Sequence, residues 1–293
     1  MFDIVIIGAG ISGMTAALYS LRAGKSVLLL ESSVYGGQII NSKEIENYPG
    51  VLNTDGFNLM KNLYEQINKY DVIYKNEEVL EIIDNNTIIT NKDKYKAGAI
   101  IVATGLRNKS LGLDKEKEFI GKGVSYCATC DGNFFKGKDV VVVGGGNTAM
   151  EDVLYLSNIV NKVYLVHRRD TFRADEVLVD KVKKLTNVEI KINSTIKDIL
   201  GSPLLNKVVL DNGQELDVSA LFIAIGKIAD NYKFSNVLDL DEQGFIISDD
   251  TTTKFPNLFV AGDCRTKKVR QLITAASDGA IAAQNAIEYL NNI

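Results

Sequence analysis

Two cysteines three positions apart are the residues most able to do chemistry in this chain. Cys127 and Cys130 form a C-x-x-C pair that is followed directly by Asp131. A pair at this spacing can close a small disulfide, and the start of a helix would favour its thiolate form. A metal site would need two more ligands, and only Cys264 and His167 are left to supply them. We therefore expect a redox dithiol and no metal; a metal site and an inert buried pair are the alternatives.

Asp131 could supply a proton that disulfide reduction consumes. Opening a disulfide with two electrons leaves two thiolates, and turnover must return protons to them. An adjacent carboxyl group can act as the general acid in such a step. The competing interpretation is a helix N-cap, where Asp is common. We expect Cys127, Cys130 and Asp131 to form the catalytic set.

A glycine motif near the start of the chain predicts a dinucleotide site. Gly8, Gly10 and Gly13 form G-x-G-x-x-G directly after the apolar run 2–7, and Glu31 follows 23 residues after Gly8. The glycines permit a tight turn, approach of the backbone to a pyrophosphate, and close packing of helix on strand. The helix start offers N–H groups and a positive dipole end to phosphates. Glu31 would bind ribose hydroxyls and repel a 2′-phosphate, which favours FAD or NAD over NADP.

The same pattern occurs a second time. Residues 3–31 and 139–167 both run from an apolar strand through a Gly-rich turn and an amphipathic helix to another strand. The second turn reads G-x-G-x-x-A, in which alanine is tolerated at the packing position. Its residues are Gly144, Gly146, Asn147, Thr148 and Ala149. The repeat predicts two related dinucleotide-binding modules.

The second copy exchanges the carboxylate at the strand end for cations. His167 stands at the place of Glu31, and Arg168, Arg169 and Arg173 follow it. Guanidinium groups bind phosphate dianions through paired hydrogen bonds. A solvated basic face is the plain alternative, and His167 could either cap the strand or lie against the nucleotide. The position at the strand end favours the 2′-phosphate of NADPH.

These patterns predict an α/β fold with two Rossmann-like dinucleotide-binding domains, each in three layers, the second inserted into the first. Each copy closes with a later apolar strand that ends in glycine, at 100–105 and 221–226. A strand-like run at 258–263 and an Ala-rich helical pattern over 271–290 complete the first domain. We expect a FAD domain over 1–112 and 242–293, and an NADPH domain with the cysteine pair over 113–241.

Composition excludes several other classes of function. A net charge of −4 argues against a nucleic-acid surface. No apolar run reaches the length of a membrane span, and residues 1–7 lack a basic leader. We expect neither a nucleic-acid nor a membrane partner, and a cytoplasmic protein.

Together the motifs resemble those of the bacterial low-molecular-weight thioredoxin reductases over nearly the whole chain. C-A-T-C-D-G at 127–132 is similar to the redox centre of that family, and 144–149 and 167–173 are similar to its NADPH site. Its early and late flavin segments resemble 36–38, 46–50, 262–263 and 270–271. The residues added to the expected cofactor sites are Gly36, Gly37, Gln38, Asn47, Thr104, Gly105, Asp263, Arg270 and Gln271.

The resemblance implies a homodimer that passes electrons from NADPH through FAD and the dithiol to thioredoxin or a similar small dithiol protein. It implies that Cys130 lies nearer the flavin, that Cys127 exchanges with thioredoxin, and that Asp263 lies near the ribityl-pyrophosphate. The alternatives are a ferredoxin-type donor, another dithiol acceptor, and a non-enzymatic redox-sensing or metal-binding module. Residues 227–231 depart from the family, which usually has a Pro-Asn turn there, so the resemblance does not give the conformation of this loop.

Overall fold

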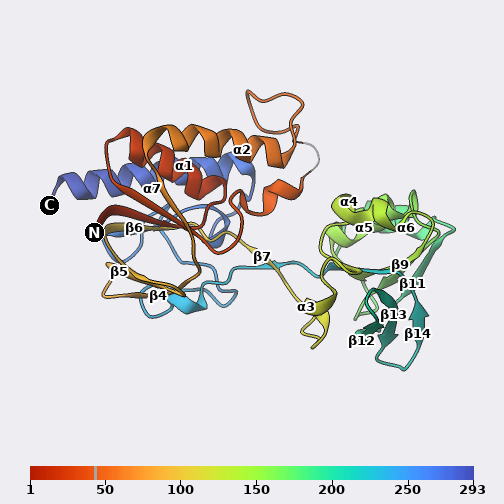
Figure 1. The fold of residues 1–293 in the computed structure, drawn as a ribbon. Coiled ribbons are helices and arrows are strands. Elements are labelled where there is room, and N and C mark those ends of the chain that lie inside the picture. Colours follow the sequence, from red (N-terminus) through yellow and green to blue (C-terminus); the bar gives the residue numbers. More distant parts are fainter. Residues whose placement is uncertain (43–44) are drawn as a thin grey trace. The chain divides into compact units, whose positions relative to one another are not determined.

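A computed structural model gives the fold of this protein and describes residues 1–42 and 45–293. The chain forms two compact units, one of Met1–Arg107 with Ile228–Ile293 and the other of Asn108–Lys227. It passes between them through β7 (Arg107–Asn108) and β16 (Lys227–Ile228), which pair with each other (Figure 1). One unit is thus inserted into the other, as the fold class predicted from the repeat requires.

A seven-stranded sheet forms the centre of the first unit. The order is β3-β2-β1-β6-β5-β4, and β17 also pairs with β6. Pairing is parallel from β3 to β6 and for β17, and antiparallel for β5 and β4. The strands are β1 (Phe2–Ile7), β2 (Val27–Glu31), β3 (Ile73–Asn76), β4 (Val79–Ile83), β5 (Thr87–Thr90), β6 (Lys94–Val102) and β17 (Leu258–Val260). The apolar runs at 4–7 and 27–30 form strands whose two faces are both buried in the sheet.

Three helices cover one side of this sheet: α1 (Ile11–Arg22), α2 (Gly56–Ile67) and α7 (Leu272–Asn291) (Figure 1). The predicted C-terminal helix is confirmed as α7. Its small residues allow α7 to pack closely on α1, and a Cβ added at Gly279 would overlap the carbonyl oxygen of Ser12. The helix start that follows the first glycine turn is therefore fixed by a helix some 260 residues later in the chain.

The second unit has three layers. Its five-stranded parallel sheet has the order β11-β10-β9-β15-β8. One apolar cluster joins this sheet to helices, and another joins it to the antiparallel sheet β12-β13-β14. The helices are α3 (Glu116–Phe119), α4 (Ala128–Asp131), α5 (Asn147–Ser157) and α6 (Glu176–Lys183). The strands are β8 (Val124–Ser125), β9 (Asp139–Gly144), β10 (Lys162–Val166), β11 (Val188–Lys191), β12 (Ile196–Gly201), β13 (Leu205–Leu210), β14 (Glu215–Asp217) and β15 (Ala220–Ala224).

Residues 228–241 pack with the first unit, whereas the sequence division places them in the second. Phe234, Val237 and Leu238 are buried in the same apolar cluster as β1, β4 and β6. This short segment has neither a glycine motif nor a regular hydrophobic period, so only its tertiary packing places it at the first unit.

Candidate functional site

The first glycine turn has a geometry that other residues could not adopt. Gly8 has φ of 106°, and a Cβ there would overlap the carbonyl oxygen of Ala103. A Cβ at Gly13 would overlap the carbonyl oxygen of Gly8. Helix α1 begins after Gly10, which has no side chain to cap it, so its first N–H groups are directed to whatever lies in the turn. This cradle fits a dinucleotide pyrophosphate.

Glu31 lies at the end of β2 beside this turn. Its two oxygens each accept a backbone N–H, Oε2 from Ala9 at 2.8 Å and Oε1 from Ser33 at 3.0 Å. These bonds hold the carboxylate in place. The hydroxyls of Ser32 and Ser33 also lie 3.3 Å from Oε1, and Oε2 keeps a lone pair for another donor. The arrangement suits the hydroxyls of a ribose.

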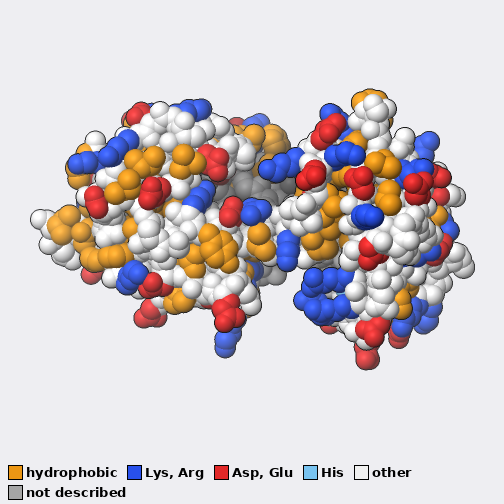
Figure 2. All heavy atoms as spheres, turned by 90° about the horizontal axis from the view of Figure 1, so that it is seen from below, with side chains coloured by type: hydrophobic (Ala, Val, Ile, Leu, Met, Phe, Trp, Pro, Cys, Tyr) orange, Lys and Arg blue, Asp and Glu red, His pale blue; other side chains and the backbone are white. Residues whose placement is uncertain are grey.

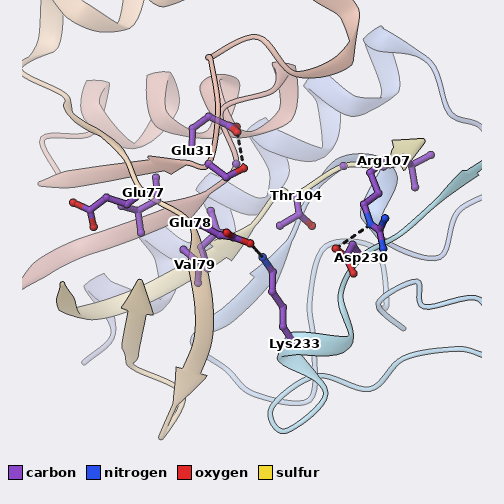
Figure 3. Close-up of a pocket in the computed structure, with 14 residues that line it drawn as sticks. Glu31, Glu77, Glu78, Val79, Thr104, Arg107, Asp230 and Lys233 are labelled. Carbon is purple, nitrogen blue, oxygen red and sulfur yellow. Dashed lines mark hydrogen bonds and ion pairs between the residues drawn. The ribbon is translucent and has the colours of Figure 1, made fainter. Parts of the chain in front are cut away.

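A cavity of about 300 Å³ opens at this point of the first unit (Figure 3). The sequence-predicted residues Gly8, Glu31, Thr104 and Gly105 all line it. Figure 3 shows two ion pairs at its wall, Lys233 with Glu78 at 3.9 Å and Arg107 with Asp230 at 3.0 Å. The cavity therefore joins the ends of β1, β2 and β6, where ligands of parallel α/β sheets bind.

The segment at 36–37 closes over the first glycine turn. The N–H of Gly36 donates to the carbonyl of Ala9 at 2.7 Å. A Cβ at Gly37 would come within 3.1 Å of the Cα of Gly10. The backbones of Gly10 and Gly37 can therefore approach closely, because neither residue has a side chain.

The early and late predicted flavin segments come together. Gln38 Nε2 donates to the carbonyl of Leu106 at 2.6 Å, and Asn47 Nδ2 donates to Gln271 Oε1 at 3.2 Å. Gln271 also caps α7 through a reciprocal capping box with Thr274. Residues distant in the chain are thereby gathered around one part of the first unit.

Arg270 offers a direct test of whether this region fits a cofactor. Its guanidinium lies over the ring of Phe245, and its buried Nε–H has no acceptor among the residues that the structure describes. A buried donor without an acceptor is unfavourable unless a ligand or water supplies one. Asp263 lies close by in the chain, in the turn Gly262–Cys264 after β17. The late motif therefore has hydrogen-bonding capacity to offer to a bound ligand.

The second glycine turn repeats the first one. A Cβ at Gly144 would overlap the carbonyl oxygen of Ala224, and Ala149 is fully buried against the turn. Helix α5 begins after Gly146, where an added Cβ would meet nothing within 4 Å. Asn147 and Asp175 bind each other reciprocally at 2.8 Å, which joins the starts of α5 and α6, and Thr148 is exposed.

His167 shapes the loop that carries the arginines. Its ring is buried, stacks on Phe172 and lies so close to Gly145 that a Cβ there would overlap it. Its Nε2 lies 3.0 Å from the carbonyl of Thr171. The N–H of Arg173 donates to the carbonyl of Gly145 at 2.8 Å. The histidine thus fixes the loop to the glycine turn, which corresponds to the capping alternative.

Three exposed cations follow β10. Arg168, Arg169 and Arg173 are exposed, and none of them takes part in an ion pair among the described residues. A set of guanidiniums beside a glycine turn, without such ion pairs, suits a phosphate group.

Cys127 and Cys130 form a disulfide with Cα atoms 5.3 Å apart. Cys127 caps the short helix α4, and its Sγ accepts the N–H of Cys130 at 3.3 Å. Thr129 Oγ1 lies 3.5 Å from the same sulfur. Ser125, at the end of β8, donates to Asp131 Oδ2 at 2.6 Å. The disulfide therefore belongs to the second unit and has the Asp131 carboxyl within the same loop.

The loop at 227–231 takes a defined conformation although it lacks the expected Pro-Asn turn. Asn231 is fully buried and accepts from Thr104 Oγ1 at 2.9 Å. Its amide donates to the carbonyls of Gly244 and Cys264 at 2.8 and 3.0 Å. Asp230, in the place of proline, pairs with Arg107. Sequence reasoning missed Asn231, because its burial and its three hydrogen bonds depend on the tertiary structure.

The described residues reveal little beyond these two sites. They contain no cluster of three side chains that could hold a metal, and no helix of the described part is long and apolar enough to cross a membrane. Cys264 is fully buried, and burial raises the pKa of its thiol. Basic and acidic side chains are interspersed over the face drawn in Figure 2.

Two glycine turns and a disulfide in one chain define an oxidoreductase of the dinucleotide-binding class. The chain belongs to the pyridine nucleotide-disulphide oxidoreductase family, which matches residues 2–280. It is 40% identical over 303 residues to a thioredoxin reductase of Listeria innocua, covering 100% of this chain and 95% of that protein. A thioredoxin reductase of Bacillus subtilis is 39% identical over 303 residues, with 100% and 96% covered. The crystal structure of Lactococcus lactis thioredoxin reductase matches with a TM-score of 0.82 and 37% identity over the whole of both chains.

Proposed function

We propose that this protein is a thioredoxin reductase that uses NADPH and FAD. The observation that carries the proposal is the Cys127–Cys130 disulfide in the same unit as the second dinucleotide turn. The family and the relatives named thioredoxin reductase support it. In this proposal the first unit binds FAD and the second binds NADPH.

The FAD assignment rests on the chemistry of the first unit. The turn at 8–13 holds the pyrophosphate, Glu31 binds the ribose, and the segments at 36–38, 47, 104–105, 263 and 270–271 surround the rest. The buried Nε–H of Arg270 supports this assignment, because a cofactor would supply the missing acceptor. Bound FAD would carry two electrons from NADPH to the disulfide.

Asp131 is the proposed proton donor for the dithiol. Two electrons and two protons convert the Cys127–Cys130 disulfide into two thiols, and Asp131 delivers one of the protons. Cys127, whose sulfur accepts hydrogen bonds from the Cys130 N–H and lies beside Thr129, then attacks the disulfide of the acceptor. Cys130 resolves the mixed disulfide, which restores the enzyme disulfide and leaves the acceptor with two thiols.

The arginines after β10 are the proposed determinants of NADPH over NADH. We expect the double substitution Arg168→Ala and Arg169→Ala to raise the KM for NADPH by roughly 10- to 100-fold. A hydrogen bond to a charged group contributes about 1.5–3 kcal/mol. The KM for NADH should change by less than about twofold, because NADH has no 2′-phosphate. Lys138→Ala, on an exposed site near the start of β10 and so at the opposite end of this strand from the arginines, is the matched control. Equal effects on both nucleotides would reject the assignment.

The proposal extends to partners and place. Thioredoxin, or a small protein with a similar exposed disulfide, is the acceptor, and the active form is a homodimer without a metal or nucleic acid. Cytosolic thiols are kept reduced, so the cytoplasm is where such a reductase would work. A ferredoxin-type donor is the second candidate. It would leave Arg168, Arg169 and Arg173 without a role, and variants of them would then keep full thioredoxin reduction.

A further inference from the structure

The side chain of Ser125 is hydrogen-bonded to the Asp131 carboxyl. Its Oγ donates to Asp131 Oδ2 at 2.6 Å, which is a short hydrogen bond. The same Oγ accepts the N–H of Cys127 at 3.0 Å. A donor that also accepts a hydrogen bond is polarised, so each of the two bonds strengthens the other.

The position of Ser125 is determined by the sheet. It ends β8, whose parallel pairing with β15 sets Ser125 opposite Phe222 in the core of the second unit. The serine is 5% exposed, so water cannot readily replace its hydroxyl. The side chain therefore lies between β8 and the loop that carries the disulfide.

One hydroxyl has one proton, and two acceptors lie near it. Asp131 Oδ2 is at 2.6 Å and the carbonyl of Cys127 at 3.3 Å, so the shorter bond to the carboxylate takes the proton. This bond engages Oδ2 whether or not the acid carries a proton on Oδ1. The carboxyl can then gain and lose a proton at Oδ1 without a change of place.

We propose that Ser125 is a positioning residue for proton transfer: it holds Asp131 by Oδ2 beside the disulfide loop, so that Oδ1 is the oxygen that passes the proton to a cysteine sulfur. The inference rests on the proposed role of Asp131 as the acid. It assigns no contact between Ser125 and the reacting sulfurs. When the disulfide accepts two electrons and becomes two thiolates, the proton leaves Asp131 Oδ1 for one sulfur, the second sulfur takes a proton from solvent, and Asp131 regains its proton from solvent.

The test is a double-mutant cycle between Ser125→Ala and Asp131→Asn in the flavin-loaded full-length enzyme. We measure kcat for reduction of oxidised thioredoxin and, separately, the rate at which NADPH bleaches the flavin anaerobically. Ser125→Ala should lower kcat roughly 10-fold, which is part of the 100-fold or greater effect typical of general acids. The rate of flavin bleaching should stay within about twofold of the wild-type rate. In the Asp131→Asn background it should lower kcat no further, because its effect acts through Asp131.

Ser125→Thr keeps the hydroxyl and should restore at least half of the wild-type kcat. Ser157→Ala, at a serine on α5 that donates only to Leu154 in the described structure, is the matched control and should change neither rate. Far-UV circular dichroism and flavin content of each variant identify any that fails to fold. If Ser125→Ala does not fold, the cycle is built with Ser125→Val and compared with Ser125→Thr, because the two side chains have the same shape and only threonine keeps the hydroxyl.

The possible outcomes separate this inference from the function beneath it. Two outcomes overturn the positioning role alone, and in both Asp131→Asn lowers kcat. In the first, Ser125→Ala has the wild-type kcat. In the second, the loss of kcat caused by Ser125→Ala adds fully to the loss caused by Asp131→Asn. An Asp131→Asn enzyme at the wild-type rate overturns the proposed acid and the inference together. Failure of NADPH to bleach the flavin of the wild-type enzyme overturns the proposed donor and leaves the serine inference to be tested with another reductant.

Discussion

Asp152 makes the stability of this protein depend on pH near neutrality. This carboxyl lies on α5, one turn before Leu156, and a Cβ at Gly132 would come within 2.8 Å of Leu156 and 3.2 Å of Tyr155. The segment after α4 therefore covers the face of α5 on which Asp152 lies. Burial, with a smaller effect of the Glu151 charge, raises the pKa of Asp152 from 3.8 to about 7.

The sign of the effect follows from which state binds more protons. Between pH 3.8 and about 7 the folded protein holds a proton on Asp152 that the unfolded chain has lost. The stabilisation from the neutral carboxyl is complete below pH 3.8 and is lost as the pH rises through 7. A folded pKa near 7 makes the unfolding free energy fall by about 1.4 kcal/mol between pH 6 and 8.5 through this group alone. Asp152→Asn cannot ionise and should not show this loss.

The assay is urea unfolding at pH 6 and 8.5, followed by far-UV circular dichroism. Relative to wild type, Asp152→Asn should gain about 1.4 kcal/mol of unfolding free energy between the two pH values. Glu151→Gln is the matched control, because it removes an exposed carboxylate from the neighbouring position and should keep most of the wild-type pH dependence. An Asp152→Asn curve parallel to that of wild type would mean that Asp152 is already ionised at pH 6, and the burial argument would be refuted.

Two further predictions concern the first unit and the cysteine pair. Asp278 is buried and accepts from Arg265, Lys267 and the N–H of Gly262 at 2.8–3.0 Å. Asp278→Asn should lower the unfolding free energy by about 3 kcal/mol in urea at pH 7, because it takes the anion from Lys267 and leaves Arg265 with the longer pair to Asp250 at 3.4 Å. Burial raises the pKa of Asp278, but the hydrogen bonds from Arg265 and Lys267 lower it by more, and the net pKa is below 3.8. The difference in unfolding free energy between wild type and Asp278→Asn should therefore shrink as the pH falls below 3.8. A constant difference down to pH 3 would contradict this. Thr129→Val removes a hydroxyl that lies 3.5 Å from Cys127 Sγ and keeps the shape of the side chain. Without this hydrogen bond to the thiolate, iodoacetamide should alkylate the reduced enzyme about two- to fivefold more slowly at pH 7. An unchanged rate would show that the hydroxyl does not stabilise the thiolate.

The parts of the fold with a regular period could be predicted from the sequence. The apolar runs after residues 2 and 139, the glycines that follow them and the helical pattern over 271–290 each obey a local rule, and each forms the expected strand, turn or helix. Glycine turns are especially predictable, because only glycine avoids overlap at positions such as Gly8 and Gly13. Local rules of this kind need no knowledge of distant residues.

Features that depend on distant residues could not be predicted. His167 stands at the strand end where a ligand-binding group was expected, yet Gly145 and Phe172 enclose its ring. Asp278 lies inside an Ala-rich helical pattern, and its importance comes from Arg265 and Lys267 in the preceding loop. The three-stranded sheet over 196–217 carries no motif, and only its packing against β9 and β15 gives it a place.

The serine before the disulfide shows the same limit at the centre of the site. Ser125 is an ordinary residue at the end of a two-residue strand, and nothing in the sequence separates it from the other serines of the chain. Its 2.6 Å bond to Asp131 arises because β8 and α4 bring residues six positions apart into contact. The sequence shows which groups can react, and tertiary structure shows which groups hold them.

The measurement that tests the central claim most directly is an anaerobic titration of the purified flavin-loaded protein with NADPH and with NADH, followed by oxidised thioredoxin. The account predicts that NADPH bleaches the flavin, that NADH at the same concentration bleaches little of it, and that thioredoxin disulfide restores the colour. A flavin that NADPH leaves oxidised, or a reduced enzyme that thioredoxin disulfide cannot reoxidise, would contradict the account.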